Sequence, residues 1–110
     1  MYARIARFEG GDTSRIDAQV AEMRTQMQSA RSGGLPADAP EGVRTLMETV
    51  SRFVHFVDRE SGTSVGIAFC ETEDEVRRAD AVLNEMSPEE GSGSRTSAEI
   101  FELVLDESFR

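Results

Sequence analysis

The stretch that most constrains this chain runs from residue 52 to residue 71, RFVHFVDRESGTSVGIAFCE. Two segments rich in β-branched and aromatic residues flank a polar turn, DRESG, which ends in a glycine that can adopt a positive φ. Turn residues placed where the apolar pattern breaks are typical of a β-hairpin. The sequence therefore predicts two antiparallel strands here, with the rest of the chain packed around them.

The turn also predicts the hairpin register. Pairing of Asp58 with Thr63 places Val54 opposite Ile67, and it places His55 opposite Gly66. The further pairs are Phe56 with Val65, Phe53 with Ala68, and Val57 with Ser64. We expect the branched and aromatic face, which carries residues 54, 56, 65 and 67, to pack against helices. His55 shares the other face with its neighbours at 53 and 57, whatever the loop length.

Other elements follow from periodicity and end signals. Residues 2–8 alternate as a strand, and residues 14–32 repeat apolar side chains at a helical period. A second helical pattern begins at Glu41, a third follows the capping box TEDE at 72–75, and a last strand covers residues 97–105. Ser14 with Asp17 resembles a further capping box, and Asp38 is placed to cap the second helix. Residues 87–90 look like another helix start, ended by a flexible loop, GSG, at 91–93.

This order predicts an α+β fold, a ferredoxin-like βαββαβ sandwich with an extra short helix before the second strand and a four-stranded antiparallel sheet. We expect residues 1–106 to form one domain and residues 107–110 to form a tail.

Composition excludes several classes of function. One cysteine, Cys70, and one histidine, His55, among 110 residues predict no disulfide and no zinc site. The formal net charge of -9, with arginine as every basic residue, disfavours nucleic acid and anionic membrane surfaces. The first ten residues are too charged for a signal peptide, and no apolar run is long enough to span a membrane. We therefore expect a cytoplasmic protein without a cofactor, and no nucleic-acid or membrane partner.

Four segments, MYARIARFEGGD, VDRESG, ETEDEVRRAD and EIFELVLD, together resemble the antibiotic-biosynthesis-monooxygenase-like group, also described as dimeric α/β-barrel proteins. The resemblance implies a homodimer whose two sheets form a barrel with the helices outside, and an apolar ligand pocket between sheet and helices. Residues 36–51 are longer than the usual connection of that group. Its haem-degrading members carry an Asn/Trp/His set, whereas this chain has no tryptophan and its one asparagine, Asn84, lies in the last helix. Haem degradation is therefore not expected.

The candidate ligand pocket consists of Tyr2, Arg52 and His55. Tyr2 is the one residue that matches the Trp, Asn and Tyr used by the group's oxygenases. His55 is suited to act as a base, because imidazole titrates near neutrality, but a lone histidine without a Ser, Cys or carboxylate placed by a motif favours a structural place at a dimer seam. Arg52 is predicted to be a solvent-exposed residue at the edge of the sheet, with contact to an anion as the alternative. No residue is predicted to be catalytic or metal-binding, and Cys70 is predicted to be a small buried hydrophobic residue.

Two functions stay open at this point. The first is a homodimeric α/β-barrel protein that binds a small apolar ligand or acts as a non-catalytic module. The second is a cofactor-independent monooxygenase-like enzyme acting on an aromatic or quinol-type substrate. A ligand-sized cavity beside Tyr2 or His55 would favour the second.

Overall fold

A computed structural model of the chain describes residues 1–87 and 93–110. The elements, in chain order, are β1 (Tyr2–Glu9), a 3-10 turn (Thr13–Arg15), α1 (Ile16–Gly33), α2 (Glu41–Thr49), β2 (Arg52–Val57), β3 (Ser64–Cys70), α3 (Glu73–Glu85) and β4 (Ser94–Glu102). The expected helix start and flexible loop at 87–93 lie largely outside the described residues.

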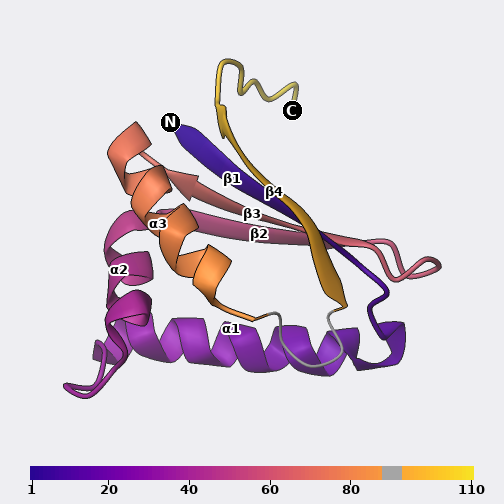
Figure 1. Ribbon diagram of the computed structural model, residues 1–110, viewed down its shortest axis with the longest axis horizontal. Coiled ribbons are helices and arrows are strands. Elements are labelled where there is room, and N and C mark those ends of the chain that lie inside the picture. Colours follow the sequence, from indigo (N-terminus) through magenta and orange to yellow (C-terminus); the bar gives the residue numbers. More distant parts are fainter. Residues whose placement is uncertain (88–92) are drawn as a thin grey trace.

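The described chain is an α+β fold with one four-stranded antiparallel sheet and three α-helices. The strand order is β2-β3-β1-β4, so the first strand lies in the interior of the sheet and the last strand at one edge. The helices lie on one side of the sheet, and the other side is left without a helix (Figure 1). This arrangement, with the short α2 before β2, is compatible with a ferredoxin-like fold.

The hairpin register predicted from the turn is confirmed. Val54 pairs with Ile67 and His55 pairs with Gly66, as do the other predicted partners. The Asp58 amide donates to the Thr63 carbonyl at 2.8 Å, and the Gly62 amide donates to the Asp58 carbonyl at 3.0 Å. That glycine, Gly62, has a φ of 77°, which is why the turn needs it.

The prediction of which hairpin face meets the helices is wrong. α3, with α2 packed beside it, covers the face of small side chains, where Ala6 and Ala68 are each 2% exposed and Cys70 is fully buried, whereas α1 lies on the same side but has no buried residue. The centre of the core is Cys70 with Val76 and Ala79 of α3, and Tyr2, Leu46, Val50 and Ile100 pack around it. Small residues on a sheet allow a helix backbone to approach closely, and the bulky side chains are left on the open face.

Several end signals differ from expectation. The capping box at the start of α3 is confirmed, since the Glu75 amide donates to Thr72 Oγ1 at 3.1 Å and the Thr72 amide donates to Glu75 Oε1 at 3.2 Å. The Ser14–Asp17 box is wrong, because Asp12 caps a 3-10 turn that precedes α1. Asp38 does not cap α2, whose N-cap position is Pro40. The backbone bends before α1 and α2 at places that local composition does not reveal.

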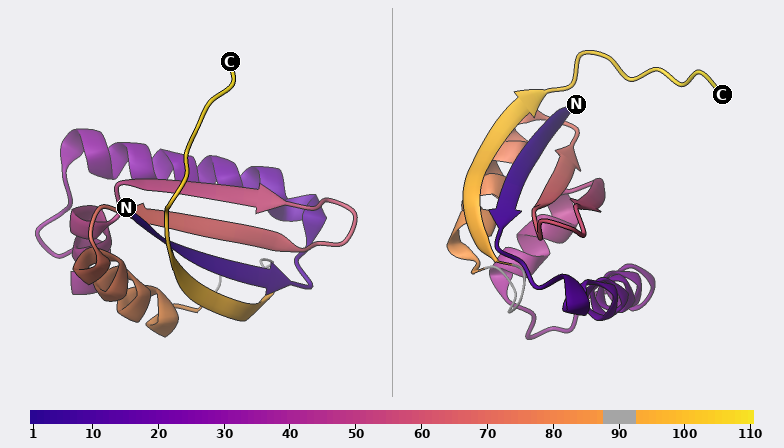
Figure 2. Two further views of the ribbon diagram at one scale, coloured as in Figure 1. Left: turned by 90° about the horizontal axis from the view of Figure 1, so that it is seen from above. Right: turned by 90° about the vertical axis from the view of Figure 1, so that its right-hand side faces the viewer.

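The last strand is displaced towards the N-terminus of its predicted range. β4 covers residues 94–102 because it pairs with β1 along that strand's whole length, with a register shift between Arg7 and Phe8. The partner strand, and not the local alternation, sets where β4 ends. After it, the Leu103 amide donates to the Met1 carbonyl at 2.9 Å, and the chain continues in extended form away from the sheet (Figure 2).

Candidate functional site

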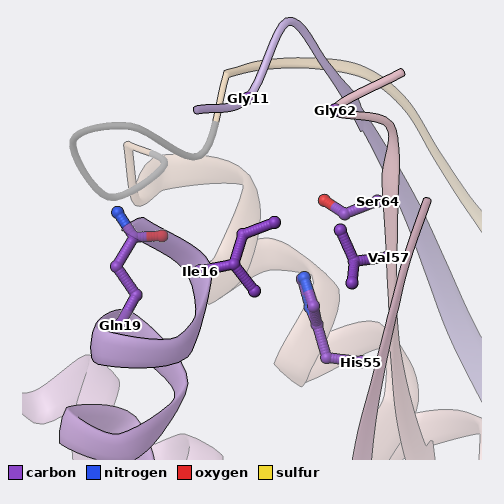
Figure 3. A pocket seen from close by; sticks show the side chains of 7 residues that line it. All are labelled: Gly11, Ile16, Gln19, His55, Val57, Gly62 and Ser64. Atoms are coloured by element: carbon purple, nitrogen blue, oxygen red, sulfur yellow. The ribbon is translucent and has the colours of Figure 1, made fainter. Parts of the chain in front are cut away.

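A small hollow lies between the start of α1 and the hairpin. Its lining residues are Gly11, Ile16, Gln19, His55, Val57, Gly62 and Ser64, and its volume is about 30 Å³. Figure 3 shows the Ile16 side chain pointing from α1 towards His55 and Val57 on β2. Two contacts hold this end of the molecule together: the Gly11 amide donates to the Gly62 carbonyl at 3.1 Å, and Arg59 pairs with Asp17 at 2.7 Å.

The size of this hollow limits what it can hold. A volume of about 30 Å³ accommodates one or two water molecules, since one water needs roughly 10–15 Å³ on the same measure, whereas a cavity of roughly 150 Å³ is known to admit benzene. An aromatic substrate therefore enters beside His55 only if Ile16 and the first turn of α1 move.

The His55 imidazole lines this hollow, and the residue as a whole is exposed. Partial burial of the ring lowers the pKa of His55 below its ordinary value, so the neutral ring predominates at pH 7. The ring also lies 6.3 Å from the Phe53 ring, centroid to centroid. Within the residues that the structure describes, no hydrogen bond or carboxylate partner orients the imidazole. His55 is thus in the right protonation state for a base but is not held by a catalytic partner.

The other two members of the predicted pocket lie elsewhere. Tyr2 shares the helix-covered face with His55, but it stands opposite Cys70 and packs against the core cluster beside α3. Arg52 lies on the open face of β2, and its guanidinium carbon is 5.9 Å from the centroid of the Phe69 ring. Of the three residues, His55 alone lines the small hollow.

The open face of the sheet carries apolar side chains that no helix covers. It carries seven large apolar residues that alternate with the helix-covered positions: Ile5, Val54, Phe56, Val65, Ile67, Phe69 and Phe101. Phe56 is 61% exposed and Phe101 is 49% exposed, although both belong to strands. No helix covers this face, which is seen from its own side in the left-hand view of Figure 2.

A second, larger hollow opens on this face at the turn end of the hairpin. It is lined by Arg7, Phe56, Val57, Asp58, Ser61, Thr63 and Val65, and its volume is about 530 Å³. Small-molecule pockets typically measure roughly 300–1,000 Å³. It is open to solvent, and its lining combines apolar side chains with polar ones, among them one cation, Arg7, and one carboxylate, Asp58. The sequence carried one signal of this site: Arg7 falls on the same strand face as Ile5.

A partly buried polar cluster, centred on Arg4, joins β1 to α3 on the opposite face. Arg4 is 4% exposed; its Nε donates to Asp80 Oδ1 and its Nη2 donates to Asn84 Oδ1, each at 2.8 Å. The Asn84 amide nitrogen in turn donates to Asp80 Oδ2 at 3.2 Å. Both side chains of α3 are thus occupied with Arg4, which gives this cluster a structural role.

Across residues 1–87 and 93–110, His, Cys, Asp and Glu side chains form no group of three or more that could hold a metal ion. Over the same residues, none of the helices combines the length and the apolar character needed to cross a membrane.

No model of a known protein family matches the chain, and a search of curated proteins finds no match either. The resemblance to the dimeric α/β-barrel group therefore depends on the quoted sequence segments alone.

Proposed function

We propose that the protein is a homodimeric module of the dimeric α/β-barrel type, in which the open sheet faces of two copies pack against each other and enclose a small apolar ligand. One observation carries this proposal: the sheet is apolar on both faces, and the helices cover only one of them.

An uncovered face of this kind is costly in water. Burying one large apolar side chain contributes roughly 1.5–3 kcal/mol, and exposed apolar patches beyond a few hundred Å² mark interaction sites in soluble proteins. A second copy supplies an identical apolar face, so one two-fold axis would cover both faces at once. Because Glu99 lies on the same face as Arg7, the two copies can also place opposite charges across the axis.

The hollow beside Arg7 supports the ligand part of the proposal. Phe56 and Val65 line it with apolar side chains, and Arg7 and Asp58 line it with one cation and one carboxylate. The Asp58 carboxylate already accepts from two backbone amides of the turn, which leaves Arg7 as the charged group for a ligand. A facing copy would close its open side and exclude water from it. The ligand class that fits is a small apolar body carrying one negatively charged group.

A cofactor-independent oxygenase is the alternative, and the neutral imidazole of His55 beside the small hollow favours it. The volume of about 30 Å³ argues against it as the structure stands. The two functions differ in what they require of His55, which is essential to the second and dispensable to the first.

The assembly is tested by sedimentation equilibrium of the wild type and two matched variants. We expect the wild type to have twice the mass of the 12.1 kDa chain. Phe56→Glu places a charge on the open face and should give a monomer with an unchanged circular dichroism spectrum. Met27→Glu makes the same change at a residue of α1 that is 45% exposed, and it should remain a dimer. A monomeric wild type, or a dimer that Phe56→Glu leaves intact, would refute the proposed interface.

Ligand binding is tested with anilinonaphthalene sulfonate, which is both apolar and anionic. We expect saturable binding to the wild-type dimer and a loss of affinity of about tenfold or more in Arg7→Gln. Equal affinity in Arg7→Gln would remove this hollow as the site. Oxygen uptake with a dihydroxynaphthalene, present in the wild type and absent in His55→Gln, would establish the oxygenase instead.

A further inference from the structure

The last residues of the chain form an extended segment whose three exposed apolar side chains pack on nothing in the described fold. After β4 the sequence reads LVLDESFR, and Val104, Leu105 and Phe109 are 85%, 74% and 98% exposed. The backbone bond from Leu103 to Met1 is the last one that ties this segment to the sheet. We call residues 104–110 the terminal arm.

The direction of the arm is informative. It leaves β4 on the side of the sheet opposite the helices (Figure 1), and the view from above in Figure 2 shows it passing across the strands in front of the open face. It thus stands over the face that the proposed dimer would cover. Any second copy seated on that face would meet the arm.

We propose that the terminal arm clasps the second copy and buries Val104, Leu105 and Phe109 against the partner's edge strand β2. This inference depends on the proposed dimer and adds to it a reciprocal exchange of arms. Each copy would supply one arm and receive one, as two-fold symmetry requires.

Length and shape allow this contact. Seven extended residues reach roughly 23–25 Å, whereas a four-stranded sheet is roughly 14–15 Å wide between its outer strands. The arm is therefore long enough to cross the partner's sheet to its far edge.

The edge strand β2 has the properties of a receiving site. It pairs with β3 alone within the sheet, so backbone donors and acceptors on its other edge are available to a further extended segment. Its Phe53 and Phe56 are 37% and 61% exposed. Its charge is also complementary, because Arg52 begins the strand and the middle of the arm carries Asp106 and Glu107.

The experiment uses the full-length chain and two variants of the arm. The test variant replaces its apolar side chains together, as Val104→Ser, Leu105→Ser and Phe109→Ser. The control, Ser108→Ala, changes an arm residue that the proposal does not use. The dissociation constant of the dimer is measured by sedimentation over a dilution series. We expect the triple variant to dissociate about 100-fold more readily and the control to match the wild type.

A second measurement locates the arm. A photoreactive benzoylphenylalanine replaces Phe109, and equal amounts of isotopically labelled and unlabelled chains are mixed before illumination. We expect cross-linked peptides that join chains of different isotopic label at residues 52–57.

The outcomes separate this inference from the dimer itself. A wild type that is monomeric refutes both. A dimer whose dissociation constant is unchanged in the triple variant refutes the arm and leaves the sheet interface standing. Cross-links confined to one chain, or to a region of the partner other than residues 52–57, refute the proposed contact with β2.

Discussion

Replacement of the buried Arg4 provides a direct test of how the sheet is held to α3. Arg4→Met keeps the length and the apolar part of the side chain but removes the guanidinium. The donors to Asp80 Oδ1 and Asn84 Oδ1, both at 2.8 Å, are lost. Breaking a fully buried ion pair by removing one partner costs roughly 3–5 kcal/mol, because a charge is left buried without compensation.

The loss of stability expected for Arg4→Met is smaller than that of a fully buried ion pair. The side chain of Asp80 is 25% exposed, so water can reach the orphaned carboxylate and part of the penalty is relieved. We expect Arg4→Met to lower the free energy of unfolding by about 2–4 kcal/mol. Asp80→Asn leaves the Arg4 guanidinium, whose side chain is only 5% exposed, without its counter-charge, so it should cost at least as much, about 2–4 kcal/mol.

The assay is urea denaturation followed by circular dichroism, applied to both single variants and the double variant. Because the two residues form one contact, the double variant should be less destabilised than the sum of the singles, by about 1–2 kcal/mol. Strict additivity would refute the reasoning, since it would mean that the orphaned carboxylate is not the source of the loss. A loss below about 1 kcal/mol for Arg4→Met would mean that the guanidinium is solvated in solution.

Two further predictions concern the end of the molecule where α1 meets the hairpin. Gly62→Ala should destabilise the protein by more than about 1 kcal/mol in thermal unfolding, because the added Cβ would lie 2.5 Å from the Gly11 carbonyl oxygen at a φ of +77°. The control is Gly33→Ala at the end of α1, where the added Cβ meets no atom, so this variant should be neutral or stabilising. Equal effects of the two substitutions would contradict the prediction. The lowered pKa of His55 predicts that stability is fully present above its unfolded pKa of 6.5 and falls as the pH drops through 6.5 towards the folded pKa, because the unfolded chain then binds the extra proton. Denaturant titrations at pH 7.5 and pH 5.5 should show a smaller change in stability for His55→Gln than for the wild type, and an identical change would exclude this role of the imidazole.

The hairpin was predictable in detail because its turn is chemically specific. Asp58 and Gly62 meet the backbone demands of one turn geometry, and that geometry fixes every cross-strand pair. The start of α3 was predictable for the same reason, since Thr72 and Glu75 satisfy each other's backbone amides. Both signals are local and need no knowledge of the rest of the fold.

The choice of face was not predictable from the same stretch. Both faces of the hairpin are apolar, so the alternation that usually identifies the core side is missing. The deciding property is the small size of Ala6, Gly66 and Ala68, which come from two strands far apart in sequence and lie side by side only in the sheet. Arg52 and Tyr2 were grouped with His55 for a similar reason: their faces and positions depend on the pairing of β1 with β3. The large hollow beside Arg7 requires that pairing as well.

The position of β1 between β3 and β4 has a consequence for the route of folding. β2 and β3 are neighbours in sequence, and a hairpin of this kind closes in roughly 1–10 μs. β1 must instead find β4 across nearly the whole described chain, and this pairing extends from Tyr2 to Glu9. Such a high contact order slows folding, because the entropy of closing the long loop is lost before the contacts form. Until β4 arrives, one edge of β1 is open and the core beneath α3 is incomplete, so the interval before this last pairing is when the chain is most exposed to aggregation.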